Sequence, residues 1–442
     1  MSENYYPEVT ILGAGLSGLS FAYHYPGKSK IFEKMNKVGG TASTDREGEF
    51  FYDHGPHVSF TNDSYVKDLL AKATPIIEKV SKPMNTNHSI EFPHPALFHL
   101  YRLPKRERSE ILKDLVHSYK TFDSTNTPEN YYDWLIRTQG KYFAKNYTAK
   151  YTRKFWQTDP KNLTTDWVSV RIPTPSISDV IDGAIGLGYK SGYYFEKFRY
   201  PKYGGFEAFS NFWKFRKKDI SIHLNKEVTL IDHKNKIIRF SDNNLEKYNI
   251  LISTIPLPEM PRIVSELPEE IKYSIKKLKY TSLHYVNLAV RGEWKKKFTW
   301  LYFYDEEIPI SRLIPFNTIN PTASPRGYTA LQVEIPYTSK YDVSLTEKSL
   351  SKLQELGYVN LDKVMNIFND YLKYGYVVYN KDRQVNLEKI LSYFKKQGIY
   401  LLGRYGTWGY LWSHQVILQG KDLAKEIAKQ AKYLRNNKIL DS

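Results

Sequence analysis

The sequence contains no cysteine, which removes several classes of chemistry at once. Without thiols, the chain has no disulfide bond, no thiolate metal site and no redox-active dithiol. No run of apolar residues reaches the roughly 18 residues that a membrane-spanning helix needs. The first apolar strand begins at Val9, too early to follow a secretory signal sequence. We therefore expect an intracellular, cytoplasmic protein without a transmembrane segment.

Acidic residues are few relative to basic ones: 47 Asp and Glu against 64 Lys and Arg give a net charge of +17. Such an excess suits an anionic partner, but most of the lysines are scattered along solvated faces. No basic helix or nucleic-acid motif is present, so we expect no nucleic-acid partner. The 442 residues, of which 41% are hydrophobic, are enough for two or three domains with cores of their own.

The N-terminal segment carries the pattern Gly-x-Gly-x-x-Gly directly after the apolar residues 9–12. Gly13 makes the tight turn, Gly15 lets backbone amides approach a pyrophosphate, and Gly18 lets the next helix lie close to the sheet. Glu33 ends the next predicted strand, where its carboxylate binds both ribose hydroxyls and repels a 2′-phosphate. The pattern therefore predicts a dinucleotide site.

A lone pattern of this kind is also found where glycines only pack a helix against a strand. The residues after Glu33 favour a flavin over NAD. A second glycine pair, Gly39 and Gly40, precedes Thr41, and the segment 51–57 follows it. This arrangement resembles the FAD-binding fold of the glutathione-reductase and amine-oxidase superfamily. With no cysteine to bond the flavin, we expect FAD to be held non-covalently.

The predicted fold class is α/β, with a discontinuous Rossmann-type FAD-binding domain, a helical domain and an antiparallel-sheet substrate domain. The FAD-binding domain is expected to combine residues 1–60, 200–260 and 396–442. We expect residues 61–199 to form the helical domain with a mobile substrate loop. Residues 261–395 are expected to form the antiparallel-sheet domain.

Hydrophobic patterns place the later elements of the nucleotide-binding domain. Alternating apolar residues predict strands at 227–231 and 236–240, and the apolar run 249–254 predicts a buried strand. A further strand is expected within 398–404, followed by a helix over 415–433.

Four segments, in the same order along the chain, resemble bacterial UDP-galactopyranose mutases. Residues 57–63 resemble the histidine loop that lines the flavin, and 151–173 resemble the mobile substrate loop with the arginine after it. Residues 308–312 are similar to the segment with a second diphosphate-binding arginine. Residues 402–416 resemble the C-terminal motif that contacts flavin and phosphate. Each motif is modest by itself, and their conjunction is fairly specific.

The resemblance implies an isomerase that interconverts pyranose and furanose forms of a nucleotide-diphosphate sugar for polysaccharide biosynthesis. N5 of reduced FAD attacks the anomeric carbon, so no metal is expected. NAD(P)H is the expected reductant, and because no second Gly-x-Gly-x-x-Gly is present, we expect it to bind transiently near the flavin. An oligomer is possible. The implied site consists of the catalytic residues Arg171, Arg312 and His57, the substrate-binding residues Tyr151, Trp156 and Tyr410, and the cofactor-binding residues Gly13, Gly15, Gly18, Glu33, Gly40, Thr41, Val228 and Arg404.

The resemblance also implies a role for each substrate contact. Arg171 and Arg312 would stabilise the departing UDP through bidentate hydrogen bonds, and Tyr410 would donate to a phosphate oxygen. Tyr151 would stack on uracil, and Trp156 would close over the sugar as the loop shuts.

Several positions depart from the family pattern. A second histidine expected after the first is Phe60, and the acid expected after the C-terminal tyrosine is replaced near Trp412. The tyrosine expected near 334–336 is Ile335, unless Tyr337 takes its place. The polar residues expected after the second arginine are replaced by 313–317. Because these changes cluster at substrate contacts, the cofactor is better supported than the substrate.

Other interpretations stay open. Taken singly, the two arginines could be interdomain ion pairs, Trp156 a core aromatic and His57 a structural histidine. A net oxidoreductase of the protoporphyrinogen oxidase, amine oxidase or desaturase type would suit residues 200–206 equally well. A flavin-binding assembly protein without activity is the third possibility, against which the retained Arg171 and Arg312 argue.

Overall fold

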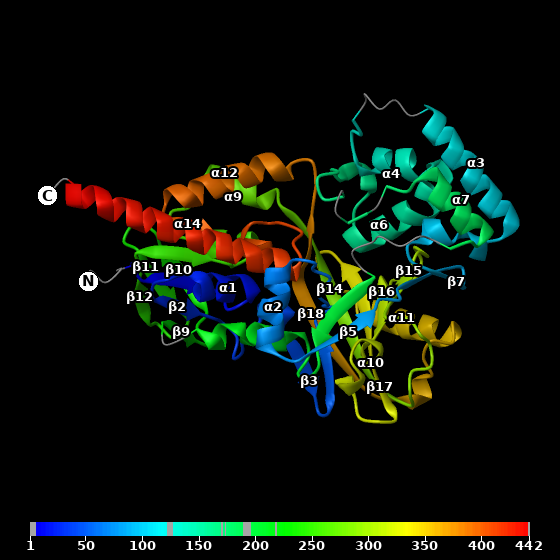
Figure 1. Ribbon diagram of the computed structural model, residues 1–442, viewed down its shortest axis with the longest axis horizontal. Helices are drawn as coiled ribbons and strands as arrows, with labels where there is room; N and C mark the ends of the chain where they lie inside the picture. Colours follow the sequence, from blue (N-terminus) through cyan, green and yellow to red (C-terminus); the bar gives the residue numbers. More distant parts are fainter. Residues whose placement is uncertain are drawn as a thin grey trace.

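The computed structural model describes residues 6–121, 127–168, 171–172, 174–188, 196–216 and 219–440. Its elements form three parts (Figure 1). A sheet covered by helices contains the N-terminal strands and the C-terminal helix, at the left of the view. A group of helices lies at the upper right, above a long antiparallel sheet at the lower right.

The first part is built on a five-stranded sheet in which every neighbouring pair is parallel. Its strands come from the beginning, the middle and the end of the chain, as a discontinuous Rossmann-type domain requires. The order is β19 (Ile399–Leu401), β13 (Ile250–Ser253), β1 (Val9–Leu12), β2 (Ser29–Phe32) and β9 (Ile220–His223). The predicted fold class is confirmed.

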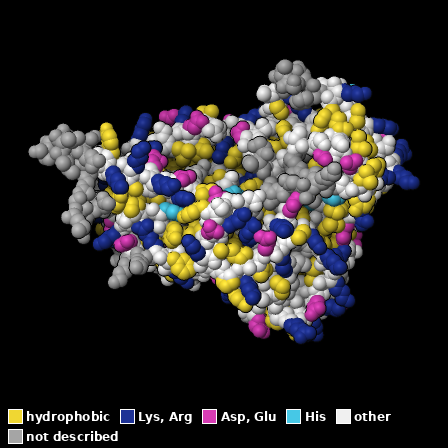
Figure 2. Space-filling model, in the orientation of Figure 1, with side chains coloured by type: hydrophobic (Ala, Val, Ile, Leu, Met, Phe, Trp, Pro, Cys, Tyr) yellow, Lys and Arg dark blue, Asp and Glu magenta, His cyan; other side chains and the backbone are white. Residues whose placement is uncertain are grey.

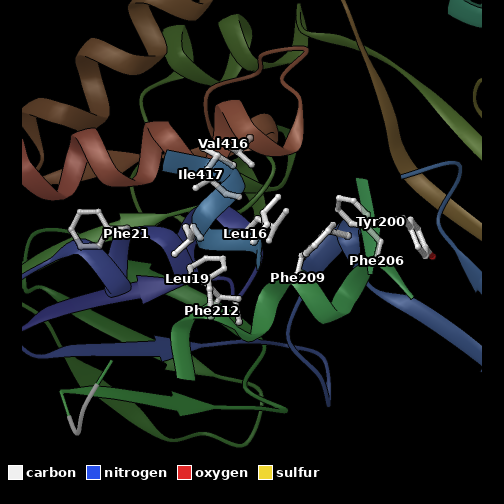
Figure 3. Packing of buried hydrophobic residues seen from close by; sticks show 14 of the residues in the cluster. Leu16, Leu19, Phe21, Tyr200, Phe206, Phe209, Phe212, Val416 and Ile417 are labelled. Carbon is white, nitrogen blue, oxygen red and sulfur yellow. The ribbon is translucent and has the colours of Figure 1, made fainter. Parts of the chain in front are cut away.

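Helices cover both faces of this sheet, as is usual for parallel sheets. On one face, α1 (Leu16–His24) packs against α14 (Ser413–Leu440), with Ser20 Oγ donating to the Ile417 carbonyl at 2.6 Å. Figure 3 shows Leu16 and Leu19 of α1 between Ile417 and the 3₁₀ helix η5 (Phe206–Phe215), which contributes Phe212. On the other face, α9 (Glu269–Lys276) and α12 (Arg383–Lys396) share a core with β13 and β19.

The antiparallel part is a seven-stranded sheet. Its order is β18 (Val364–Val378), β14 (Lys279–Arg291), β17 (Tyr328–Tyr337), β16 (Arg312–Pro315), β15 (Leu301–Phe303), β6 (Met84–Asn87) and β7 (Ile90–Pro93). Strands β6 and β7 come from the region expected to be helical, and β6 pairs with β15 in parallel. The edge of this sheet is therefore supplied by a remote segment. The proposed domain boundaries stay predictions.

The helical part contains α3 (Lys105–Thr121), α4 (Tyr131–Gln139), α6 (Ala149–Trp156) and α7 (Ile177–Ile185). Helix α6 is fixed to the antiparallel sheet by the buried Lys154. Its Nζ donates to the carbonyls of Phe303, at 2.7 Å, and Ile310, at 3.2 Å, and also to that of Asp305. Helix α6 is thus fixed next to β16, which begins with Arg312.

The remaining elements are short. The predicted strands near 230 and 238 are observed as β10 (Val228–Asp232) and β11 (Ile237–Phe240), in a separate antiparallel sheet with β12 (Leu245–Lys247). The predicted C-terminal helix is α14. Further elements are β3 (Thr44–Glu47), β4 (Phe50–Asp53), α2 (Ser64–Ala73), β5 (Ile76–Val80), β8 (Lys197–Pro201), α10 (Phe316–Ile319), α11 (Ser344–Glu355) and α13 (Gly403–Gly406).

Basic side chains are distributed over the face of the molecule seen in Figure 2. Figure 2 shows lysine and arginine side chains spread among acidic ones over the visible face instead of gathered in one patch. Within the described ranges, none of the helices combines the length and the apolar character needed to cross a bilayer.

An ion-paired histidine connects the two large parts. His54 follows β4, and its Nε2 lies 2.7 Å from Asp45 Oδ2 on β3 and 3.2 Å from Asp370 Oδ2 on β18. Burial acts to lower the pKa of His54, but the hydrogen bond to Asp45 and the charges of both aspartates outweigh it and raise the pKa. Lys37 Nζ lies 2.7 Å from the other oxygen of Asp45. The cluster therefore ties the β3–β4 hairpin to the antiparallel sheet.

Replacing His54 with glutamine should destabilise the protein more near pH 6 than near pH 9. A histidine with a raised folded-state pKa adds stability that is fully present below its unfolded pKa of about 6.5. That stability is lost as the pH rises through the higher folded-state pKa. Melting temperatures of the parent and H54Q across this range measure the effect, with H117Q on α3 as the control. A difference of constant size at every pH would contradict this account.

Candidate functional site

One cavity of about 1120 Å³ runs from the carboxyl ends of the parallel strands to the space beneath α6. It is lined by residues of all three parts. Pockets for single small ligands are typically about 300–1,000 Å³, so this cavity has room for two ligands side by side. Every residue predicted for the site lines it, with the exception of Gly18. Their roles stay predictions, and the geometry below describes where they lie.

Two glycines of the N-terminal pattern are required by the fold itself. Gly13 has a φ of +102°, and a Cβ there would lie 2.1 Å from Thr254 Oγ1. A Cβ on Gly18 would lie 2.2 Å from the Gly13 carbonyl oxygen, because α1 packs directly on the turn. Neither position accepts a side chain, whatever the protein binds.

Gly15 is different, because the protein alone would accept a side chain there. Its φ is −74°, an ordinary value, and the nearest atom to an added Cβ is the Gly39 carbonyl oxygen at 3.8 Å. Gly15 lines the cavity just before α1 begins at Leu16, where free backbone N–H groups and the helix dipole favour an anion. A ligand that must approach the backbone closely, such as a pyrophosphate, would explain why glycine occupies this position.

The ribose end of the predicted site is formed by Glu33 at the end of β2. Its buried carboxylate accepts from the Ala14 N–H at 2.8 Å and from the Met35 N–H at 2.9 Å. Each oxygen keeps a second lone pair for a ribose hydroxyl. Gly40 packs against the pattern, since a Cβ there would lie 3.1 Å from the Gly15 Cα. Thr41 and, on β10, Val228 line the same end.

Several lining residues carry a buried nitrogen atom that has no hydrogen-bond partner in the described part of the chain. Among these atoms are Nε of Arg404 and Nδ1 of His57. Arg404 is otherwise fixed by its terminal nitrogens, which donate to the Leu411 and Gly375 carbonyls at 3.0 Å each. Burial, with the positive charges of His54 and Arg404, lowers the pKa of His57 to about 3. A neutral imidazole and an unpaired N–H in a cavity wall fit the polar edge of a flavin.

Arg312 enters the cavity from β16 and is fixed by Glu334 of β17. Its Nη2 lies 2.5 Å from Glu334 Oε2 and donates to the Tyr376 hydroxyl at 2.7 Å, while Nε lies 3.2 Å from Oε1. The Glu334 side chain is fully buried and also accepts from Ser311 Oγ at 2.6 Å. Burial opposes the charge of Arg312, yet the Glu334 carboxylate raises the pKa of Arg312 further.

Arg171 also lines the cavity, where its guanidinium lies over aromatic rings. Its guanidinium carbon is 3.7 Å from the ring centre of Tyr410 and 4.3 Å from that of Trp412. The same guanidinium donates to the Tyr410 carbonyl. Tyr410 is 6.0 Å from Tyr376, the ring that contacts Arg312. The two predicted arginines are therefore connected through a pair of tyrosines on one cavity wall.

Two of the aromatic residues expected to bind substrate, Tyr151 and Trp156, belong to α6. Tyr151 packs edge-on against Tyr302 and Tyr304, and its buried hydroxyl has no partner within the described chain. Trp156 is 4% exposed and packs on Tyr376 and Tyr410. Trp156 is thus a core aromatic and a cavity wall at the same time. The expected mobility of this segment stays a prediction, and part of 169–173 lies outside the described residues.

Sequence reasoning missed Glu334 and Tyr376, which fix Arg312. The tyrosine sought near Glu334 is absent for a structural reason: Ile335 points into a hydrophobic core, and neither it nor Tyr337 is among the lining residues. Tyr376 of β18 supplies a hydroxyl at this wall from another strand. A buried acid in a strand that otherwise reads as apolar was the signal for Glu334. Phe60 lines the cavity beside Trp300.

Two groups of described residues bring carboxylate and imidazole atoms close enough to hold an ion. They are Asp45, His54 and Asp370, and His88, Asp305 and Glu307. In the first group, His54 and Lys37 already pair with Asp45, so it is an ion-pair cluster at the cavity edge. The second group lies outside the cavity.

Residues 11–73 match the family model of an NAD(P)-binding Rossmann-like domain. The crystal structure of reduced UDP-galactopyranose mutase superposes with a TM-score of 0.89 at 22% identity, over 97% of this chain and 95% of that chain. The chain has the fold of that mutase. The resemblance expected from the sequence is thereby confirmed at the level of the fold.

Two further solved structures share the fold at lower similarity. A protein from Exiguobacterium sp. 255-15, described as a putative protoporphyrinogen oxidase, has a TM-score of 0.74 at 16% identity, over 96% of this chain and 99% of that chain. A putrescine oxidase has a TM-score of 0.64 at 12% identity, over 95% and 98%. The fold is thus shared with oxidases as well as with a mutase, and the site must decide the activity.

Replacing Gly15 with valine should leave the protein folded and remove its flavin, because the side chain would occupy the space beside the bare backbone. The parent should release FAD into the supernatant after heat denaturation, and chromatography against an FAD standard measures the content of both proteins. The matched variant G18V should instead lower the melting temperature, since its Cβ would clash with the Gly13 carbonyl. Full FAD content in G15V, bound NAD, or flavin retained on the precipitated chain would contradict the predicted site.

Proposed function

We propose that this protein is a flavin-dependent mutase that interconverts the pyranose and furanose forms of a nucleotide-diphosphate sugar, as in the UDP-galactopyranose mutase family. The observation that carries the proposal is that Arg171 and Arg312, which contact the neighbouring rings of Tyr410 and Tyr376, line one cavity together with the bare backbone at Gly15. Two guanidinium groups beside a dinucleotide site suit a second diphosphate, namely that of the substrate.

The two arginines would stabilise negative charge in different ways. Arg312 is preorganised by a buried carboxylate, so its position changes little when an anion arrives. Arg171 is oriented by ring faces and by the Tyr410 carbonyl, and its guanidinium would donate to phosphate oxygens. As the anomeric C–O bond breaks, charge grows on the departing diphosphate, and fixed donors in a closed site lower the barrier. Reduced FAD, when bound, supplies the nucleophile for the anomeric carbon.

The aromatic walls would position the substrate and exclude water. Tyr151 and Trp156 lie on α6, which Lys154 fixes above the sheet. Their faces suit a base and a sugar ring, and the Tyr410 hydroxyl would donate to a phosphate oxygen. Neutral His57 would contribute a hydrogen bond at the flavin without adding charge.

A net oxidoreductase of the protoporphyrinogen oxidase, amine oxidase or desaturase type is the second candidate. It is favoured by the two oxidases that share the fold and by an aromatic-rich cavity lining that includes Trp300, Tyr302 and Tyr304. Such an enzyme would reduce its oxidised flavin on addition of substrate and consume oxygen. A mutase leaves the oxidation level of its substrate unchanged.

Replacing Arg171 or Arg312 with alanine should slow conversion of a nucleotide sugar by the reduced enzyme while flavin content stays normal. The expected loss is about 2.7–4 kcal/mol in the barrier, or 10²–10³-fold in kcat, by analogy with single oxyanion donors. Lysine should rescue only in part, because it retains the charge and loses the planar fork. Chromatography of isomeric products measures the rate.

The control is R153A, which removes an arginine on α6 that pairs with Glu306 and does not line the cavity. Since R312A leaves Glu334 buried without its partner, R312A/E334Q separates lost activity from lost stability. Parental turnover in both alanine variants, or lower melting temperatures with normal turnover, would mean that the two arginines have a structural role and no catalytic one.

A further inference from the structure

Trp412 occupies the position where the mutase resemblance leads one to expect an acid. Its ring centre lies 4.3 Å from the guanidinium carbon of Arg171, and the Tyr410 ring centre lies 3.7 Å from the same carbon. At these distances a cation is attracted by the negative faces of aromatic rings. Two side chains separated by one residue therefore both contact one guanidinium.

The backbone around Trp412 is itself fixed. The Trp412 N–H donates to Gln415 Oε1 at 2.8 Å, and the Val416 N–H donates to the Trp412 carbonyl at 3.1 Å at the start of α14. The residue between the two rings, Leu411, accepts from Arg404 Nη1 at 3.0 Å. The segment that contacts Arg171 is thus fixed by the arginine at the middle of the cavity and by the long C-terminal helix.

The chemistry of this contact differs from that of an acid. A carboxylate at position 412 would accept hydrogen bonds from the N–H groups of Arg171 in an ion pair. A ring face attracts the guanidinium cation without accepting those hydrogen bonds. A planar cation is required for such stacking, which is a reason for arginine instead of lysine.

We propose that Trp412 is a positioning residue, which together with Tyr410 holds the Arg171 guanidinium in the orientation that binds the diphosphate of the substrate. The inference rests on the proposed function, because it takes the diphosphate to be the ligand of Arg171. Trp412 acts through Arg171, so its contribution disappears when Arg171 is absent.

A double-mutant cycle with UDP as the probe tests this role. Isothermal titration of UDP into the oxidised, FAD-loaded protein measures affinity without turnover. W412A should weaken UDP binding about three- to tenfold, and W412F should retain most of the affinity because it preserves a ring face. In the R171A background, W412A should cause no further loss. The control is W294F, which changes a tryptophan remote from the cavity.

The outcomes separate the two proposals. If the parent binds UDP and W412A binds it equally well, or loses the same factor with and without Arg171, the role of Trp412 is overturned while the mutase proposal stands. If W412F loses as much as W412A, the ring face is not what matters and the inference is likewise overturned. If the FAD-loaded parent binds neither UDP nor any other nucleoside diphosphate, the proposed function fails and the diphosphate role of Trp412 fails with it.

Discussion

The buried ion pair between Arg312 and Glu334 fixes the geometry of the cavity. Glu334 is fully buried, and its two oxygens hold Arg312, Ser311 and the Tyr376 hydroxyl. A Cβ on Gly55 would lie 3.5 Å from Glu334 Oε2, so the histidine loop packs on the same pair. Removing one member of a buried pair typically costs about 3–5 kcal/mol. Residues of β16, β17 and β18 and the loop after β4 thus lie around the Glu334 carboxylate.

This arrangement lets one cavity serve two anionic groups. The bare backbone at Gly15 lies at the end of the parallel sheet, where free N–H groups of α1 favour one diphosphate. Arg171 and Arg312 line the other end, where cationic side chains favour a second. Arg404 and His57, each with a nitrogen atom that has no partner among the residues the structure describes, line the same cavity. Under the proposed function, backbone dipoles would bind the cofactor and guanidinium groups would bind the substrate.

The sequence revealed those parts of the site whose chemistry is local. The glycine pattern, Glu33 and the segment around Arg404 are read within a few residues, because each turn and cap is built by neighbours. Strands with clear alternation, such as β10 and β11, were found for the same reason. The fold class followed from the order of these elements.

Contacts between residues far apart in the sequence could not be predicted in this way. Glu334 and Tyr376 lie on separate strands: the pairing of β16 with β17 sets Glu334 opposite Arg312, and the registers of β14 with β17 and β18 bring Tyr376 to the same place. The pairing of His54 with Asp370 and the addition of β6 and β7 to the antiparallel sheet depend on tertiary packing in the same manner. The Ile335 substitution looked like a loss in the sequence, while Tyr376 supplies a hydroxyl from the next part of the sheet.

The comparison of reduced with oxidised enzyme tests the central claim most directly. The nucleophile of the proposed reaction exists only in reduced flavin, although substrate and product have the same oxidation level. Dithionite-reduced protein is incubated anaerobically with a panel of nucleotide sugars, and chromatography detects isomeric products. The account predicts turnover of one of these sugars by the reduced protein and none by the fully oxidised protein. Equal conversion by oxidised protein under air, or substrate-dependent flavin reduction with oxygen uptake, would contradict it.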